Sequence, residues 1–146
     1  SGFPGARKVS DWVALGVKPR AGRLNGSLRA ALILPMGKDG PKFLAYHNFS
    51  EVFLEWNKSL VNTLTAGYLA TRIGGADRYL KGNSSAKLSD AQMKTLQTRL
   101  ASRGHDVGKI DGILGAGTRA AVRAEQARLG MAADGWPTDA LVRALR

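Results

Sequence analysis

The segment from residue 104 to residue 126 constrains the fold more than any other, because glycine-rich turns in it lead directly into a helical pattern. Asp111 and Gly112 predict a turn, since glycine adopts positive φ without steric cost. Thr118 is predicted to begin an amphipathic helix. The same order returns at residues 134–138, where Asp-Gly-Trp-Pro-Thr precedes another apolar helical pattern. We therefore expect a small repeated helical module.

A further helix is predicted from Ser89 to Arg103, before the glycine-rich segment. Ser89 and Gln92 have the spacing of a capping box, and Gly104 follows as a helix-ending glycine. The apolar positions of the three helices recur at helical spacing, which indicates one shared core. The predicted core residues are Met93, Leu96, Leu100, Val122, Leu129, Leu141 and Leu145.

A set of landmarks between residues 88 and 146 keeps a characteristic order and spacing. They are Leu96-Gln97, Leu100, Gly104, Ile110-Asp111-Gly112, Gly115, Thr118, Ala121-Val122, Gln126 and Asp134-Gly135. This set resembles the small three-helix peptidoglycan-binding domain that is joined to many cell-wall enzymes. The resemblance implies a groove for the stem peptide or the glycan, bordered by the loop from Asp106 to Thr118. It also implies that Arg103, His105 and Arg119 meet carboxylates, while Asp111 forms a turn first and contacts ligand second.

Glu125 departs from that family, which usually has an aromatic residue at this position. It shares a helix face with Val122 and Leu129, where an unpaired buried carboxylate is costly. We therefore expect a partly exposed Glu125 at the edge of the core, close to a basic side chain. The candidate partners are Arg99, Arg128 and Arg143. On this reasoning, Glu125→Phe stabilises the domain by about 1–2 kcal/mol.

The first half of the chain predicts a β-hairpin followed by helices. Apolar runs at residues 28–34 and 42–47 flank a turn rich in Gly, Pro and Asp. A short helix is expected around Trp12, within a loop-rich segment. A helix containing Val52, Phe53 and Trp56 is expected next, and a second one runs from Leu60 to Ile73.

Five separated landmarks in residues 8–75 arrive in a recognisable order. They are Trp12…Leu15-Gly16-Val17, Leu32…Pro35-x-Gly37…Gly40-Pro41-x-Phe43-Leu44, Asn48-Phe49, Trp56-Asn57-x-Ser59 and Leu69-Ala-Thr-Arg-Ile73-Gly74. They resemble the closing section of the catalytic domain of lytic murein transglycosylases, in the membrane-bound type B group of glycoside hydrolase family 103. The resemblance implies an α+β, mainly α fold. A β-hairpin plus helices, from the end of a lysozyme-like catalytic domain, is joined to the three-helix domain.

These resemblances give a domain organisation. Residues 1–75 are expected to be the C-terminal part of a catalytic domain, 76–88 a polar linker, and 89–146 the peptidoglycan-binding domain. The family's acid/base glutamate lies upstream of the landmarks, and no carboxylate in residues 1–83 matches its motif. We therefore expect no catalytic residue in this chain. Association with an N-terminal part of the catalytic domain is expected.

Trp56 and Asn57 align with the family's aromatic-Asn pair that lines the substrate cleft. Trp56 also falls on the apolar face of its predicted helix, so a core role and a sugar contact both remain open. Asn57 stands at a predicted helix break, so a helix cap and an amide contact with an N-acetyl group both remain open.

The formal net charge is +11, with 12 basic and 5 acidic residues in 1–83 and 10 basic and 6 acidic residues in 84–146. Such a surface favours polyanions, but no run of basic residues, zinc spacing or aromatic RNA-binding signature accompanies it. We therefore expect no nucleic-acid partner; an anionic cell-wall polymer, a membrane surface and solubility alone each remain explanations of the charge. Two isolated histidines and no cysteine predict neither a metal site nor a cofactor.

Together these features predict a periplasmic protein of the bacterial cell envelope that binds peptidoglycan, both glycan strand and stem peptide. Within the full-length enzyme, the resemblance implies lytic transglycosylase cleavage of the β-1,4 bond between MurNAc and GlcNAc, leaving 1,6-anhydromuramic ends. The alternative is a non-catalytic cell-wall-binding protein. No apolar run approaches the ~20 residues that a bilayer span requires. Because the chain begins at Ser1 and not at a native start, a longer natural sequence is expected.

Overall fold

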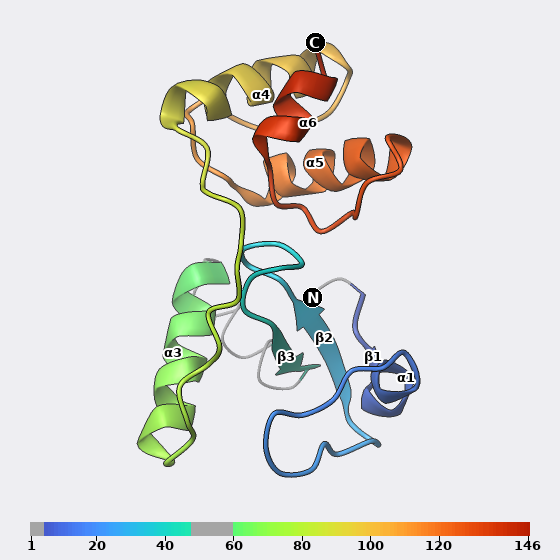
Figure 1. Cartoon of the computed structure of the whole chain (residues 1–146), viewed down its shortest axis with the longest axis vertical. Coiled ribbons are helices and arrows are strands. Elements are labelled where there is room, and N and C mark those ends of the chain that lie inside the picture. The colour runs from blue at the N-terminus through green and yellow to red at the C-terminus, as the bar shows by residue number, and fades with distance from the viewer. Residues whose placement is uncertain (1–4, 48–59) are drawn as a thin grey trace. The chain divides into compact units, whose positions relative to one another are not determined.

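The computed structural model describes residues 5–47 and 60–146, whose helices and strands are labelled in Figure 1. The chain divides into two compact units. The first unit comprises residues 1–33 and 42–80, and the second comprises residues 34–41 and 81–146. The turn of the predicted hairpin therefore groups with the C-terminal part of the sequence.

The first unit contains a three-stranded antiparallel sheet in the order β1-β2-β3. Strand β1 spans Arg7–Lys8, β2 spans Arg29–Ile33 and β3 spans Phe43–Tyr46. Ala31 pairs with Ala45 across β2 and β3, so the predicted hairpin is confirmed. The sequence pattern does not predict β1, because two consecutive charged residues carry no apolar alternation.

Two helices accompany this sheet in the described part of the first unit. Helix α1 spans Val9–Ala14, and the indole Nε1 of Trp12 donates to the Ala30 carbonyl at 2.8 Å. Helix α3 has the predicted bounds, Leu60–Ile73. Tyr68 and Tyr79 meet edge to face with ring centroids 5.0 Å apart.

The helix predicted around Val52, Phe53 and Trp56 lies outside the described residues. Between α3 and α4 the chain contains no helix or strand, and the two units divide after Leu80. None of the helices in the described ranges combines the length and the apolar character that crossing a bilayer requires.

The second unit contains three helices, α4 (Asp90–Ser102), α5 (Ala116–Arg128) and α6 (Asp139–Ala144). Ser89 accepts from the Gln92 backbone N–H and Gln92 accepts from Ser89, which confirms the predicted capping box. Helix α5 begins two residues before the predicted Thr118. Gly115 serves as its N-cap in an extended conformation, so Thr118 already lies inside the first turn.

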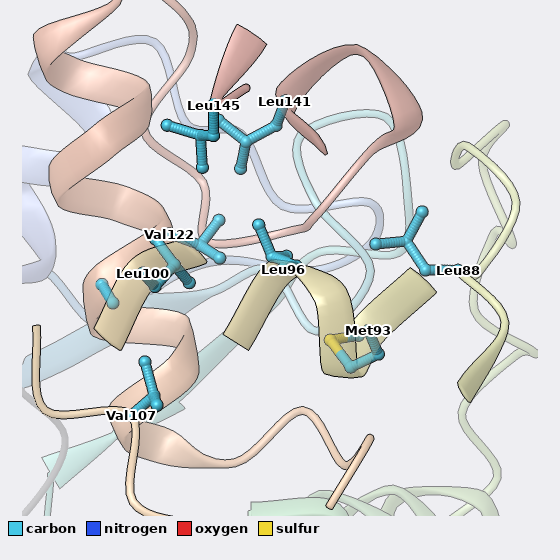
Figure 2. Close-up of a cluster of buried hydrophobic side chains, with 9 residues drawn as sticks. Leu88, Met93, Leu96, Leu100, Val107, Val122, Leu141 and Leu145 are labelled. Carbon is cyan, nitrogen blue, oxygen red and sulfur yellow. The ribbon is translucent and has the colours of Figure 1, made fainter. Parts of the chain in front are cut away.

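The three helices share one apolar core, drawn in Figure 2. Leu96 of α4 and Leu141 of α6 are fully buried, and Val122 faces them from α5. The core residues are Leu88, Met93, Leu96, Leu100, Val107, Ala121, Val122, Leu141 and Leu145. Every predicted core residue belongs to this set except Leu129, which is partly buried against it. Complete burial of one leucine side chain contributes about 1.5–3 kcal/mol, so the predicted apolar stripes account for the packing.

Candidate functional site

Two turns in the second unit are built in the same way, each around a buried glutamine. In the first, Gln97 of α4 accepts from the Gly112 backbone N–H at 2.9 Å through Oε1. Its Nε2 donates to the Ile113 carbonyl at 3.0 Å and lies 3.4 Å from Oδ1 of Asp111. The same Oδ1 accepts from the Ile113 backbone N–H at 2.8 Å. One amide side chain thus holds a complete Asp-Gly-Ile turn.

The second turn repeats these contacts with Gln126 of α5. Its Oε1 accepts from the Gly135 backbone N–H at 2.9 Å, and its Nε2 donates to the Trp136 carbonyl at 3.0 Å and to Asp134 Oδ1 at 2.9 Å. Asp134 Oδ1 also accepts from the Trp136 backbone N–H at 2.9 Å. Gly112 and Gly135 have φ values of 84° and 73°, so both turns require glycine at this position. The predicted repeat of turn and helix is therefore present in atomic detail.

A hollow of about 380 Å³ opens beside the first turn. Asp106, Lys109, Asp111 and Ile113 are among its lining residues, together with the backbone around Gly117. The backbone N–H of Ile113 donates to Asp111 and holds the pKa of this carboxyl below its ordinary value, and Gln97 adds to the effect. Asp111 therefore stays ionised at neutral pH, at the edge of a concave surface that also carries the cation of Lys109.

Glu125 is buried, in contrast to the partly exposed position that its sequence context predicts. Its residue exposure is 5%. Oε2 accepts from Arg128 Nη2 at 2.8 Å and from Nε at 2.9 Å, while Oε1 lies 2.9 Å from His105 Nε2. Hydrogen bonds from Arg128 and then from His105 outweigh the effect of burial and lower the pKa of Glu125. The prediction of a basic partner is thus confirmed for Arg128, and the predicted exposure is wrong because His105 supplies a second polar contact.

Arg119 and Trp136 bind the turn of residues 34–41, which belongs to the same unit. Arg119 Nη2 donates to the Pro35 carbonyl at 2.8 Å, and its guanidinium lies 5.9 Å from the centroid of the Trp136 ring. Burial lowers the pKa of Arg119, and the charge of Arg123 lowers it further. The side chain that was predicted to meet a ligand carboxylate therefore contacts a backbone carbonyl in this structure.

The other predicted site residues that the structure describes take different positions in the second unit. Asp106 lines the hollow and accepts from the Gly108 backbone N–H at 3.0 Å. Thr118 is buried and supports the loop from inside, since Gln97 Nε2 lies 3.3 Å from its hydroxyl. Arg103 is the exposed C-cap residue of α4. Trp56 and Asn57 lie outside the described residues.

Gln97 and Gln126 are among the family landmarks, but the sequence pattern predicts no function for either side chain. The sequence pattern that could have identified them is a glutamine followed later in the chain by an Asp-Gly pair. This pattern occurs twice in residues 97–135. Among the described residues, no group of three or more His, Asp and Glu side chains is arranged to hold a metal ion.

Comparisons with known proteins assign both parts of the chain. Residues 2–71 match the family model of the transglycosylase SLT domain, and residues 89–145 match that of the peptidoglycan binding domain. A comparison with curated proteins gives no significant match.

Two solved structures of SltB3 from Pseudomonas aeruginosa are similar to this chain at 40% sequence identity. One is a complex with NAG-NAM-pentapeptide (TM-score 0.75) and the other with NAG-anhNAM-pentapeptide (TM-score 0.74). Each match covers 97% of this chain and 39% of the SltB3 chain. This chain is therefore composed of a transglycosylase SLT domain region followed by a peptidoglycan-binding domain.

Proposed function

We propose that the chain binds peptidoglycan through the domain formed by α4, α5 and α6. Within a longer protein, its SLT domain region takes part in lytic cleavage of the β-1,4 bond between MurNAc and GlcNAc, which leaves 1,6-anhydromuramic ends. The observation that carries the proposal is the order of the two family matches in one chain. The similarity to SltB3, a protein solved with NAG-NAM-pentapeptide, supports it.

The proposed domains can be given residue ranges. We propose residues 1–75 as the C-terminal part of a catalytic domain of glycoside hydrolase family 103, 76–88 as a linker and 89–146 as the binding domain. The location would be the periplasm, where peptidoglycan is found. The basic surface, with 22 Lys and Arg against 11 Asp and Glu, is suited to an anionic polymer.

The proposed reaction needs a single carboxyl group, which protonates the leaving oxygen and then deprotonates the 6-hydroxyl of the muramyl residue. None of the carboxylates in residues 1–83 matches the family's catalytic context. We therefore propose that the catalytic group comes from the remainder of the enzyme, with which residues 1–75 would associate. On this proposal the chain binds the cell wall but does not cleave it by itself.

A sedimentation assay with purified sacculi tests both parts of the proposal. The chain should pellet with sacculi at about 0.15 M salt, and no 1,6-anhydro muropeptides should be released. Salt screens the attraction between exposed charges, which extends over about 8 Å at physiological ionic strength. Binding that is lost entirely at higher salt would therefore show that the interaction is only a non-specific charge attraction. Release of anhydro products by the chain alone would refute the assignment of catalysis to the remainder of the enzyme.

A further inference from the structure

The turn of residues 34–41 lies within the sequence that the SLT domain model matches, yet it belongs to the second unit. Two hydrogen bonds hold it there. The backbone N–H of Lys38 donates to Asp134 Oδ2 at 2.8 Å, and Arg119 Nη2 donates to the Pro35 carbonyl at 2.8 Å. The partners are 96 and 84 residues apart, so no local sequence pattern produces this contact.

Close packing accompanies these hydrogen bonds. Gly37 has a φ of 78°, and a Cβ at this position would lie 2.8 Å from Cβ of Trp136 and 2.9 Å from Asp134 Oδ2. The missing side chain therefore lets the backbone of the turn reach the carboxylate. Trp136 is 8% exposed, and its indole Nε1 donates to the Ser85 carbonyl at 3.2 Å.

A third segment, just before α4, also contacts the turn. The backbone N–H of Asn83 donates to the Asp39 carbonyl at 2.7 Å. Gly82 lies so close to the same carbonyl oxygen that a Cβ at this position would overlap it. Three separate segments of the second unit thus meet at the turn of residues 34–41.

The first glutamine-centred turn has the same internal contacts but holds no such segment. Asp111 is exposed, and the hydrogen bonds described for its side chain come from Gln97 and Ile113, which build the turn itself. Ile113, at the position equivalent to Trp136, is 67% exposed. Only the second turn therefore uses its outer carboxylate oxygen and its large side chain to bind another part of the chain.

We propose that the Asp134-Gly135-Trp136 turn is an internal docking surface whose occupant is the turn of residues 34–41. We call this contact the latch. Because residues 34–41 join β2 to β3, the latch gives the SLT domain region a second link to the peptidoglycan-binding domain, besides the covalent segment 81–88. On this proposal, which goes beyond the proposed function, the second turn is committed to the latch and takes no part in cell-wall binding.

Asp134→Asn in the full chain is the variant that opens the latch. Oδ1 of Asp134 accepts from Gln126 and from the Trp136 backbone, and the amide oxygen of the variant can keep both contacts. Its NH₂ group then faces the Lys38 N–H, so that a donor meets a donor. The substitution therefore removes the docking contact and leaves the turn in place.

Hydrogen exchange and ¹⁵N relaxation of the labelled full chain measure the result. In the wild type, we expect a protected Lys38 amide and heteronuclear NOE values for Gly37 and Lys38 as high as those of α5. In Asp134→Asn, the Lys38 amide should exchange about tenfold faster or more, and both NOE values should fall. The Gly135 amide, which donates to Gln126, should stay protected and so report an intact turn.

Asp111→Asn is the matched control, because it makes the same chemical change in the first turn. We expect it to leave the exchange of Lys38 and both NOE values at their wild-type levels. Equal effects of the two variants would overturn the latch, since the effect would then come from lost charge alone. A wild-type Lys38 amide that exchanges as an unprotected one would overturn it directly, and this measurement decides if Asp134→Asn does not fold.

Sedimentation with purified sacculi distinguishes failure of the latch from failure of the proposed function. Asp134→Asn should pellet as the wild type does, because the second turn is not a cell-wall contact on this proposal. A variant that keeps its Gly135 protection but no longer pellets would overturn the commitment of this turn to internal docking. If the wild type itself does not pellet, the proposed function fails, and the exchange of Lys38 still decides on the latch.

Discussion

Glu125 offers the sharpest test of how this small domain is held together. The residue is 5% exposed, and its carboxylate bridges His105 and Arg128, which connects the loop after α4 to α5. Glu125→Gln keeps the size of the side chain and removes its charge. The Arg128 side chain is 57% exposed and can be hydrated after the change, so that contact is worth less than about 1 kcal/mol. The His105 side chain is 25% exposed, so its loss weighs more, and we expect a total cost of about 1–2 kcal/mol.

The same substitution changes the dependence of stability on pH. The pKa of Glu125 is lowered in the folded chain, first by the hydrogen bond from Arg128 and then by that from His105. Its stabilising contribution is therefore fully present above the ordinary pKa of 4.5 and is lost as the pH falls through the lower folded value. Glu125→Gln should therefore be less stable than the wild type at pH 7, and its stability should approach that of the wild type at low pH. Asp111 and Asp134 also have lowered pKa values. Both residues are present in the wild type and in Glu125→Gln, so they do not contribute to the difference between the two proteins.

Thermal melting by far-UV circular dichroism, combined with hydrogen exchange of α5, measures the effect. For a domain of this size, 1–2 kcal/mol corresponds to a decrease of about 4–16 °C in Tm at pH 7. Asp77→Asn, an exposed charge change between α3 and α4, should leave Tm unchanged. A Glu125→Gln chain that melts with the wild type from pH 3 to pH 8 would refute the role of this ion cluster. Glu125→Phe, expected from the sequence to stabilise, should now destabilise, and a higher Tm would equally refute the reasoning.

Two further predictions concern the glutamine-centred turns. Gln97→Ala leaves the buried N–H of Gly112 without its acceptor and should cost about 2–3 kcal/mol, seen as a lower urea midpoint, whereas Thr98→Ala on the exposed side of α4 should cost under about 1 kcal/mol. Equal midpoints for the two variants would contradict the turn's dependence on Gln97. Gly37→Ala should shift the Trp136 indole resonance and lower Tm more than Gly22→Ala, because both have positive φ but only Gly37 meets neighbouring atoms. If the two glycine variants behave alike, the turn of residues 34–41 does not pack on Trp136 in solution.

The sequence by itself determined the elements whose signals are local. The α4 capping box at Ser89, the bounds of α3 and the pairing of β2 with β3 follow from caps, periodicity and turn residues over short stretches of chain. The apolar stripes likewise identified the core, since burial of one helix face follows from its own repeat. The two family resemblances also depend on spacing along the chain, and the matches to the transglycosylase SLT domain and to the peptidoglycan binding domain bear out their broader form.

Tertiary structure alone decided where the polar side chains act, because their partners are distant in sequence. Glu125 is buried because His105, twenty residues earlier, reaches its second oxygen, and no helical period encodes that contact. Arg119 contacts Pro35 and Asp134 contacts Lys38 across 84 and 96 residues. The two Asp-Gly turns look alike in sequence, and only the fold covers one and leaves the other open. A buried polar group must find a partner wherever the chain supplies one, so its function is fixed by the assembled structure and not by its neighbours in sequence.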